Sequence, residues 1–247
     1  MPEELARAQA FLARGDMAGT RSQPSPFGTA VFTDEAPMRQ DGNYLRVERD
    51  ADPEALAAEA LELGSRIIFV PDAARGERLA PYFEKHGWRV DRIVIMAQRR
   101  DPERSADHSL VREVGEKRLR PARHRVLTGE PWATPELLEQ LFRAKQLIGE
   151  RVQTRFFAVL VDGEVVSYTD LYQDGPDAQV EDVGTVHEHR GRGYATAVVL
   201  TAIAEARRAG AEFVFLCADK NDWPQELYRR LGFDELGYYV KFAPPHT

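Results

Sequence analysis

The chain has 247 residues, of which 43% are hydrophobic and 30% charged, a balance that is ordinary for a soluble globular protein. It contains no run of about 18 apolar residues and a single cysteine, Cys217, so we expect no membrane partner, no internal disulfide and a reducing cytoplasmic location. The net charge of −7, with glutamates interleaved among the arginines of 112–125, argues against a nucleic-acid partner.

The first half of the chain alternates helices with strands. The residues between Met17 and Pro26 are rich in Gly, Ser and Pro, which is typical of a loop. Helices are expected at 1–14, 52–64 and 79–86, and strands at 28–33, 43–49, 66–70 and 88–98. The charged stretch 99–108, which contains Pro102, is typical of a linker. We therefore expect two domains, 1–104 and 105–247.

The second half shows the same alternation. Helices are expected at 116–127, 135–149, 193–209 and 223–231, and strands at 110–114, 155–161, 164–172, 178–187, 212–218 and 233–242. Pro121 should break or bend the first of these helices, and Thr134 should cap the second. The pair Asp162-Gly163 between two apolar runs is a strong signal for a β-hairpin.

An internal repeat connects the two halves. The order strand, helix, strand, helix, strand occurs at 43–98 and again at 178–242, and each helix ends at a glycine. Tyr82–Trp88 matches Leu227–Phe233 best, because both end in Gly followed by an aromatic residue. The repeat predicts an α/β (α+β) fold of two related lobes, each with a mixed, mostly antiparallel sheet flanked by helices. The alternative is that any α/β protein alternates in this way.

A glycine-rich turn is the most informative segment. Arg190-Gly-Arg-Gly-Tyr-Ala195 follows a predicted strand and opens a predicted helix, so the amides of about 191–196 lack helical partners and can hold a diphosphate. Arg190 and Arg192 can add charged contacts. A dinucleotide-binding loop would need a third glycine where Thr196 stands, and no Gly-Lys-Ser/Thr triplet of a nucleotide loop occurs. A simple solvated turn remains the alternative.

The pattern Arg-x-x-Gly-x-Ala from Arg190 to Ala195, after a strand ending at Val186-His187, resembles the coenzyme A loop of the GNAT superfamily of N-acetyltransferases. Leu227–Phe233 resembles the Tyr-x-x-x-Gly-Phe ending of that superfamily. The resemblance covers about 111–242 and is specific at 183–233. It implies acetyl-CoA as co-substrate, no metal, and direct transfer of the acetyl group to the amine of a small molecule or a peptide.

The resemblance also implies roles for individual residues. Asn221 would bond the pantetheine arm, and Tyr228 would give a proton to the departing thiolate. A helix cap ahead of Trp223 and simple helix packing are the respective alternatives. The remaining cofactor-binding residues would pair with the pantetheine or hold the diphosphate: Thr185, Val186, Arg190, Gly191, Arg192, Gly193, Tyr194, Ala195 and Thr196.

A base must take a proton from the ammonium of the acceptor. Glu181 and Asp182 lie on the strand that enters the site, and adjacent strand residues face opposite sides, so we expect at most one of them to face the acceptor. Glu181 is our choice as the catalytic base, although a water chain can replace both. Tyr168, Asp170 and Tyr172 share one face of the neighbouring strand, where they line either the acceptor site or an ordinary half-buried sheet face.

The first lobe lacks the glycine-rich turn and the tyrosine of the second. It has Asp50-Ala-Asp-Pro53 in place of the glycine-rich turn, and Phe83 stands where Tyr228 stands. We therefore expect a degenerate N-terminal lobe beside an active one. Two other functions stay open, a non-catalytic acetyl-CoA-binding sensor or docking module and an acyltransferase that uses a longer acyl-CoA. The acceptor is not specified by the sequence, and the protein is expected to be a monomer or a homodimer.

Overall fold

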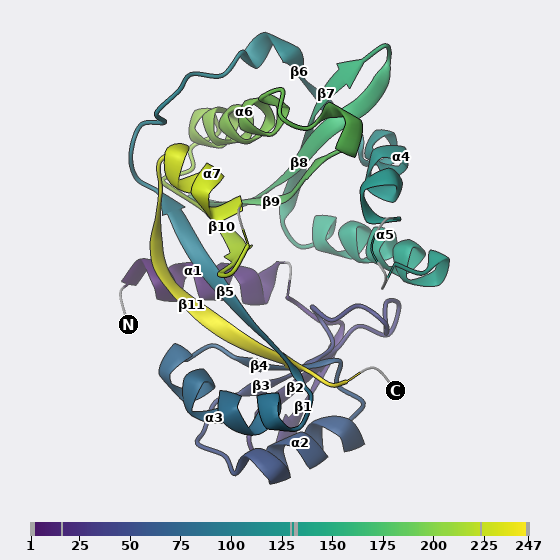
Figure 1. The fold of residues 1–247 in the computed structure, drawn as a ribbon, viewed down its shortest axis with the longest axis vertical. Coiled ribbons are helices and arrows are strands. Elements are labelled where there is room, and N and C mark those ends of the chain that lie inside the picture. Colours follow the sequence, from purple (N-terminus) through teal and green to yellow (C-terminus); the bar gives the residue numbers. More distant parts are fainter. Residues whose placement is uncertain (1–2, 16, 129, 131–132, 223, 246–247) are drawn as a thin grey trace. The chain divides into compact units, whose positions relative to one another are not determined.

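The structure, a computed structural model, describes residues 3–15, 17–128, 130, 133–222 and 224–245 (Figure 1). These residues form two units. The first contains 3–95, 217–222 and 235–245, and the second contains 96–216 and 224–234. The division predicted at 104/105 separates the two copies of the sequence repeat, and it does not coincide with these units, because the C-terminal residues belong to the first one.

The first unit is built on a sheet with the strand order β1-β2-β3-β4-β11-β5. Its strands are β1 (Arg21–Ser25), β2 (Gly28–Phe32), β3 (Tyr44–Val47), β4 (Ile67–Val70), β5 (Arg89–Gln98) and β11 (Phe233–Ala243). Its helices are α1 (Glu3–Arg14), α2 (Pro53–Glu62) and α3 (Ala73–Lys85). Strands β3 and β4 are parallel, whereas β11, the last strand of the chain, pairs antiparallel with β4.

Strand β1 corrects the loop expected at 17–26. It pairs antiparallel with β2, and Pro24 lies opposite Thr29. Because β1 is the edge strand of the sheet, proline is tolerated there without the loss of an internal ladder bond. A polar strand that contains proline has no alternating apolar pattern, which explains why the sequence indicated a loop.

The core of the first unit combines residues from distant parts of the chain. The ring of Phe83 stacks on that of Phe242, with 4.2 Å between centroids, and meets the ring of Trp88 edge-on at 5.0 Å. Phe83 and Phe242 are fully buried. Buried aromatic rings of this size dominate the stability of a core, so the C-terminal strand is part of the first unit's hydrophobic centre.

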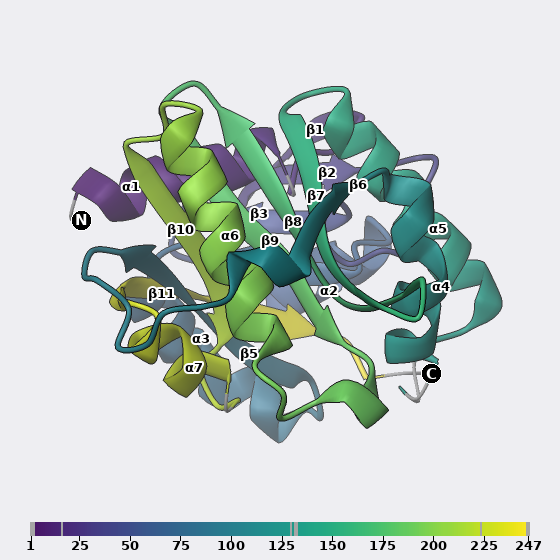
Figure 2. The same ribbon diagram turned by 90° about the horizontal axis from the view of Figure 1, so that it is seen from above.

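The second unit has a sheet with the strand order β10-β9-β8-β7-β6. Its strands are β6 (Val111–Val114), β7 (Gln153–Val161), β8 (Glu164–Asp174), β9 (Asp177–Thr185) and β10 (Phe213–Asp219). Its α-helices are α4 (Glu116–Leu127), α5 (Pro135–Gly149), α6 (Tyr194–Arg208) and α7 (Pro224–Arg230). Helix α6 covers one face of β7–β9, and α4 and α5 cover the other (Figures 1 and 2).

Several local predictions for the second unit are confirmed. Asp162 and Gly163 have φ values of 51° and 84° and form the hairpin turn between β7 and β8. Thr134 caps α5 by accepting a hydrogen bond from the Leu137 amide at 3.2 Å. Pro121, however, does not break α4, which runs without interruption from Glu116 to Leu127. Burial of Leu119 and Ala122 against the sheet provides the stabilisation that offsets the lost backbone bond.

The two copies of the repeat share their local geometry. Helices α2 and α6 end with the same backbone bond, from Ser65 N to Ala60 O and from Ala211 N to Ala206 O, each 2.9 Å long. The parallel pair β3–β4 corresponds to β9–β10. The observed architecture is the predicted α/β fold with mostly antiparallel sheets flanked by helices, and common descent of the two lobes stays a prediction.

Candidate functional site

The predicted coenzyme A loop lies between β9 and α6 in the second unit. A short 3-10 helix, His187–His189, follows β9, and Gly193 is the N-cap residue of α6. Gly191 and Gly193 have φ values of 75° and 78°, and a Cβ added to either would meet no atom within 4 Å. Glycine is therefore required here for its left-handed backbone and not for lack of space.

The backbone amides of this loop are bare. The N–H groups of residues 191–196 have no hydrogen-bond acceptor among the described residues, and the first bond of α6 runs from Ala197 N to Gly193 O at 3.0 Å. Directly before the loop, the amide of His189 donates to Val186 O and that of Arg190 to His187 O. Consecutive unpaired donors at the start of a 15-residue helix, where the helix dipole is positive, form an anion-binding geometry.

Both arginines of the loop are exposed, and each uses only some of its N–H donors in the contacts described here. Arg190 donates through Nε to Thr185 O at 3.2 Å, and Arg192 donates through Nη2 to Glu188 O at 3.3 Å. Each guanidinium has five N–H donors, so one contact leaves most of them for an anion in solution. These side chains can add charge-assisted bonds beside the bare amides.

The strand that enters the loop is paired unequally on its two edges. The ladder between β9 and β10 consists of the pairs from Asp177–Phe213 to Gln179–Phe215, whereas the ladder with β8 continues to Thr185. Beyond Gln179, β9 is thus paired with β8 alone within the second unit. A strand edge of this kind offers backbone groups to an extended ligand.

Val186 does not fit its predicted role as a residue whose backbone groups bind the cofactor. Its N–H donates to Val166 O at 2.9 Å, and its carbonyl accepts the His189 amide at 2.9 Å. Both backbone groups are therefore used inside the protein, because the 3-10 turn begins here. Thr185 remains a candidate at the strand edge, although its carbonyl accepts Arg190 Nε and its hydroxyl bonds to Ser167 Oγ.

Tyr228 and Asn221 lie in different units. Tyr228 is on α7 in the second unit, is 8% exposed and meets the ring of Phe233 edge-on at 6.1 Å. Asn221 is exposed in the turn after β10, in the first unit. Its backbone N–H donates to Asp219 Oδ1 at 2.8 Å. The alternative role of Asn221 ahead of Trp223 cannot be assigned, since Trp223 lies outside the described residues.

A β-bulge directly after the predicted base changes the orientation of Asp182. Tyr168 pairs with Gly184 and Asp170 with Glu181, so β9 has one residue more than β8 in this interval, and Asp182 has a φ of 51°. Glu181 stands opposite Asp170 on the face covered by α4 and α5. Asp182 reaches the same face, because its Oδ2 accepts a bond of 2.8 Å from Arg123 Nε, and Arg123 also binds Asp170. The expectation that at most one carboxylate faces this side was wrong.

Four charged side chains meet on this face, each from a different element, and we call them the ion-pair cluster: Arg123 of α4, Lys145 of α5, Asp170 of β8 and Asp182 of β9. Lys145 Nζ lies 3.1 Å from Asp170 Oδ2 and 3.5 Å from Asp182 Oδ2. Arg123 and Asp170 are 2% and 0% exposed. Tyr172 closes the cluster, since it receives a bond from Lys145 and donates to Asp170.

The cluster fixes the charges of its members. Burial acts to raise the pKa of Asp182, but the nearby Lys145 and Arg123 outweigh it and lower that pKa below its usual value. Burial acts to lower the pKa of Lys145, but Asp170 outweighs it and holds that pKa well above its usual value. Asp182 is therefore a poor proton acceptor at neutral pH. Glu181 is held differently, by a bond of 2.6 Å from the neutral amide of Gln179.

The sequence reasoning missed Arg123 and Lys145. A signal for Arg123 exists, because it shares the buried stripe of α4 with Leu119 and Ala122, at the spacing of one helix face. Lys145 follows the buried Ala144 in α5 in the same way. A cation within the apolar stripe of a helix indicates a buried counter-charge. That counter-charge could not be assigned without the strand pairing.

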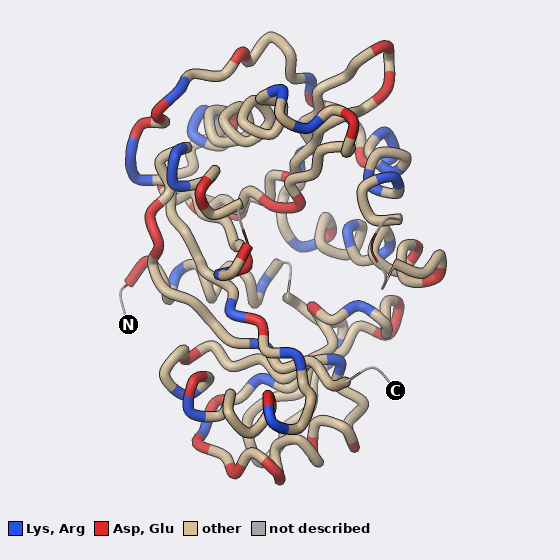
Figure 3. The backbone as a smooth tube through the Cα atoms, viewed as in Figure 1, with Lys and Arg blue, Asp and Glu red and all other residues tan. Residues whose placement is uncertain are grey.

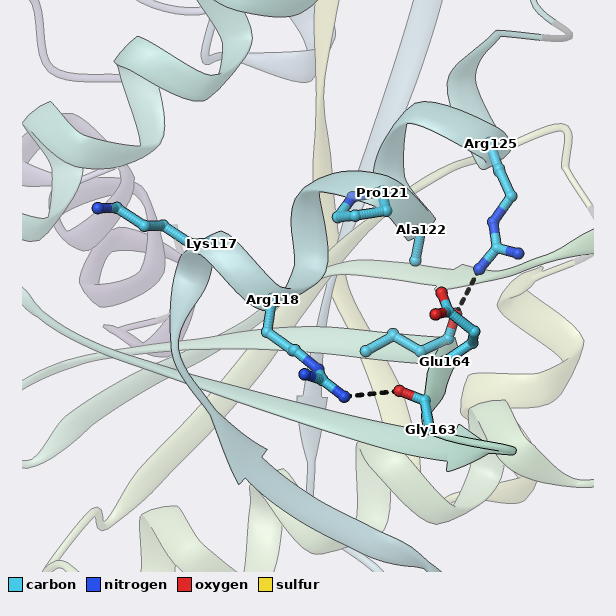
Figure 4. A pocket seen from close by; sticks show the side chains of 8 residues that line it. Lys117, Arg118, Pro121, Ala122, Arg125, Gly163 and Glu164 are labelled. Atoms are coloured by element: carbon cyan, nitrogen blue, oxygen red, sulfur yellow. Dashed lines mark hydrogen bonds between the residues drawn. The ribbon is translucent and has the colours of Figure 1, made fainter.

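Two surface hollows lie elsewhere in the second unit. One, of about 170 Å³, lies between α4 and the β7–β8 turn (Figure 4). Arg118 and Arg125 reach its wall and donate to the carbonyls of Gly163 and Val165 at 2.6 and 2.9 Å. Figure 3 shows how strongly basic α4 is. The other hollow, of about 350 Å³, lies beside α6, and neither hollow is lined by a residue predicted for the site.

Comparison with known proteins points to one family. Residues 118–233, a little under half of the chain, match the family model described as Acetyltransferase (GNAT) family. This segment contains the glycine-rich loop, Glu181, Asp182 and Tyr228, and the match is consistent with a member of the GNAT superfamily. No curated protein matches the chain at a significant level.

Two solved structures, the first two of the three described below, share the fold. A GCN5-related N-acetyltransferase from Kribbella flavida is 17% identical over 100% of this chain and 98% of its own, with a TM-score of 0.65. A tandem GNAT protein from the clavulanic acid biosynthesis pathway is 16% identical over 94% and 86%, with a TM-score of 0.56. A GNAT-family protein from Novosphingobium aromaticivorans, 23% identical, covers only 62% of this chain and 64% of its own, with a TM-score of 0.47.

Two further observations concern the described residues alone. They contain no group of three or more His, Cys, Asp or Glu side chains arranged to hold a metal ion. Their helices include none with both the length and the apolar content that a bilayer crossing requires.

Proposed function

We propose that the domain 105–247 transfers the acetyl group of acetyl-CoA directly to a primary amine. The observation that carries this proposal is the run of bare amides at 191–196, at the start of α6, which contains the two left-handed glycines Gly191 and Gly193. The match to the GNAT family, whose members use acyl-CoA, supports the acyl donor. The acceptor is the amine of a small molecule or a peptide.

The donor would bind through the backbone. The amides of 191–196 hold the two linked phosphates, and Arg190 and Arg192 add charged contacts. The pantetheine arm lies along the edge of β9 beyond Gln179, where Thr185 can pair with it and Asn221 can add a bond. A ligand held by main-chain groups is insensitive to the loss of any one side chain.

The chemistry needs three proton transfers. Glu181 takes a proton from the ammonium of the acceptor, directly or through water, and the neutral amine then attacks the thioester carbonyl. Amides beside the strand edge stabilise the oxyanion that forms. The intermediate collapses with cleavage of the carbon–sulfur bond, and Tyr228 gives its proton to the departing thiolate. The excess proton on the new amide nitrogen passes to the Tyr228 phenolate, directly or through water, which restores the phenol. The products are the N-acetylated amine and coenzyme A.

The first lobe, residues 1–104, is proposed to be degenerate. Its strand β3 is paired with β4 along Tyr44–Arg46, nearly to its end at Val47. Where the second lobe has its glycine-rich turn, Asp50 accepts bonds from Arg75 and Arg78 at 3.2 and 3.1 Å. Asp50 thus occupies donors of both arginines, and this segment has no glycine-rich turn to offer bare amides, so the first lobe is proposed not to bind a diphosphate. The same proposal includes a cytoplasmic location and a monomer or homodimer.

Calorimetry and a thiol assay test the proposal together. The purified chain is titrated with coenzyme A and acetyl-CoA, and the release of free thiol is then followed with a panel of primary amines. We expect micromolar binding and thiol release that depends on one class of amine. Binding without release would instead support an acetyl-CoA sensor, and faster release from longer acyl esters would support a different acyltransferase. Absence of binding to any coenzyme A ester contradicts the proposal.

A further inference from the structure

The ion-pair cluster joins four elements around the β-bulge of β9. Arg123 bridges two strands, because its Nη2 binds Asp170 on β8 and its Nε binds Asp182 on β9. Lys145 repeats this bridge from α5, with its Nζ within 4 Å of both carboxylates. Within the cluster two cations face two anions, which offsets the cost of burying them, and Glu116 Oε1 lies 3.8 Å from Arg123 Nη1 at its edge.

The cluster lies where the backbone of β9 is strained. Asp182 has a φ of 51°, in the left-handed region that residues with a Cβ rarely adopt, and Arg123 and Lys145 bind its carboxylate. Tyr168 packs at the far end of the bulge on the same face, since its ring fills the space where a Cβ on Gly184 would stand. Side chains thus hold the bulge at both of its ends.

The bulge begins directly after Glu181, which stands opposite Asp170. Without the extra residue, the alternation of the strand would turn Asp182 to the face covered by α6 and would change the register beyond it. With the bulge, Glu181 and Asp182 share the face covered by α4 and α5. The two carboxylates that the cluster holds, Asp170 and Asp182, are thus the cross-strand partner and the sequence neighbour of Glu181.

We propose that Arg123 and Lys145 are positioning residues for acetyl transfer, which hold the bulge of β9 through Asp170 and Asp182 so that Glu181 meets the acceptor amine. This inference rests on the proposed function, because it assigns these residues to the acceptor side of the same site. It predicts that the cluster affects the reaction of the amine and not the binding of the coenzyme, since the amides of 191–196 lie outside it.

The test uses the full chain and apolar replacements of the cations. Arg123→Met and Lys145→Met remove one bridge each, and Asp182→Gly removes the carboxylate but keeps a residue that adopts a positive φ without strain. Arg120→Met is the matched control, because Arg120 lies on the same helix and pairs with Glu116 at 3.2 Å. For each variant we measure the melting temperature, the Kd for coenzyme A, kcat and the KM of the amine.

We expect Arg123→Met and Asp182→Gly to lower kcat/KM for the amine at least tenfold while the Kd for coenzyme A stays within threefold of wild type. Arg120→Met should leave both kcat/KM for the amine and the Kd for coenzyme A unchanged. A variant that is folded and binds coenzyme A but keeps wild-type kcat/KM overturns the inference and leaves the cluster a purely structural element. If Arg123→Met does not fold, Lys145→Met carries the same test, because Lys145 is nearer the surface. A wild-type chain without activity would refute the proposed function instead.

Discussion

Phe83 in the first unit and Tyr228 in the second have equivalent surroundings within their repeats. The ring of Phe83 meets Trp88 at an interplanar angle of 67°, and the ring of Tyr228 meets Phe233 at 66°. Each of the two residues is followed, five positions later, by its aromatic partner. The repeat thus provides a natural comparison of the two rings, in which the hydroxyl is the difference.

This relationship leads to a prediction for Tyr228→Phe. The packing against Phe233 needs only the ring, so the variant should fold and bind coenzyme A as the wild type does. Loss of the proton donor should lower kcat by roughly one to two orders of magnitude. Steady-state kinetics and calorimetry measure the two quantities. Unchanged turnover would remove Tyr228 from the mechanism.

Gly193→Val should weaken coenzyme A binding. Valine at a φ of 78° costs about 1–2 kcal/mol and moves the amides of the loop, so we expect the Kd to rise at least tenfold. Gly163→Val is the matched control, because Gly163 has a φ of 84° and equally open surroundings but lies in the β7–β8 turn. Both variants should lose a similar amount of stability. If their affinities for coenzyme A were equal, the assignment of the 191–196 loop to coenzyme A binding would be contradicted.

The chain should bind one molecule of coenzyme A, not two. The first lobe has Asp50 bound by two arginines where the second has its bare amides. Calorimetric stoichiometry measures the number of sites directly. A value near two would show that the first lobe is not degenerate.

Gly76→Ala tests the place of the C-terminal strand. A Cβ on Gly76, within α3, would lie 2.4 Å from Cγ2 of Val240 on β11. Alanine normally favours a helix by up to about 1 kcal/mol over glycine, but overpacking here should destabilise the protein by about 1–3 kcal/mol. Thermal unfolding shows whether the variant is less or more stable than the wild type. The double variant with Val240→Ala should recover part of the loss, and a stabilised single variant would contradict the contact.

Arg155→Met should change the pH dependence of stability. Hydrogen bonds from Arg155 hold the pKa values of Glu113 and Glu205 below their usual range, at distances of 2.6 to 2.9 Å. A lowered carboxyl pKa stabilises the fold above the unfolded value of about 4.3, and this contribution is lost as the pH falls through the folded pKa. Because Glu113 is half exposed, we expect only about 1 kcal/mol in total.

Melting temperatures of wild type and Arg155→Met, measured from pH 3 to pH 7, test whether the stabilisation by Arg155 is lost as the pH falls. The difference should be largest near neutral pH and should shrink toward pH 3. A difference that is independent of pH would mean that Arg155 acts through packing, for instance against Phe157, and not through its charge.

Local features of this fold could be predicted from the sequence. The hairpin at Asp162-Gly163, the cap at Thr134 and the glycine-rich turn before α6 each depend on a few adjacent residues with fixed backbone preferences. For the same reason, the candidate coenzyme A loop was located to the residue. Helix and strand positions followed from the spacing of apolar side chains.

The remaining features depend on distant contacts. Nothing near Asp182 indicates a positive φ, because no turn signal such as the glycine after Asp162 stands beside it, and so the alternation rule failed at Glu181 and Asp182. Similarly, the apolar pattern of β11 specifies a strand but not its partner, and the pairing of Val240 with Val70 joins residues 170 positions apart. Strand β1 was missed because an edge strand needs no apolar alternation.

The pairing of β11 with β4 has a consequence for synthesis in the cell. The first unit cannot complete its sheet until Val240, which pairs with Val70, has left the ribosome. Until then, the edge of β4 is open to other chains, and closure over such a long stretch of polypeptide is slow. Nascent chains of this protein therefore spend a period exposed to aggregation, and a substitution that weakens β11 should lengthen that period.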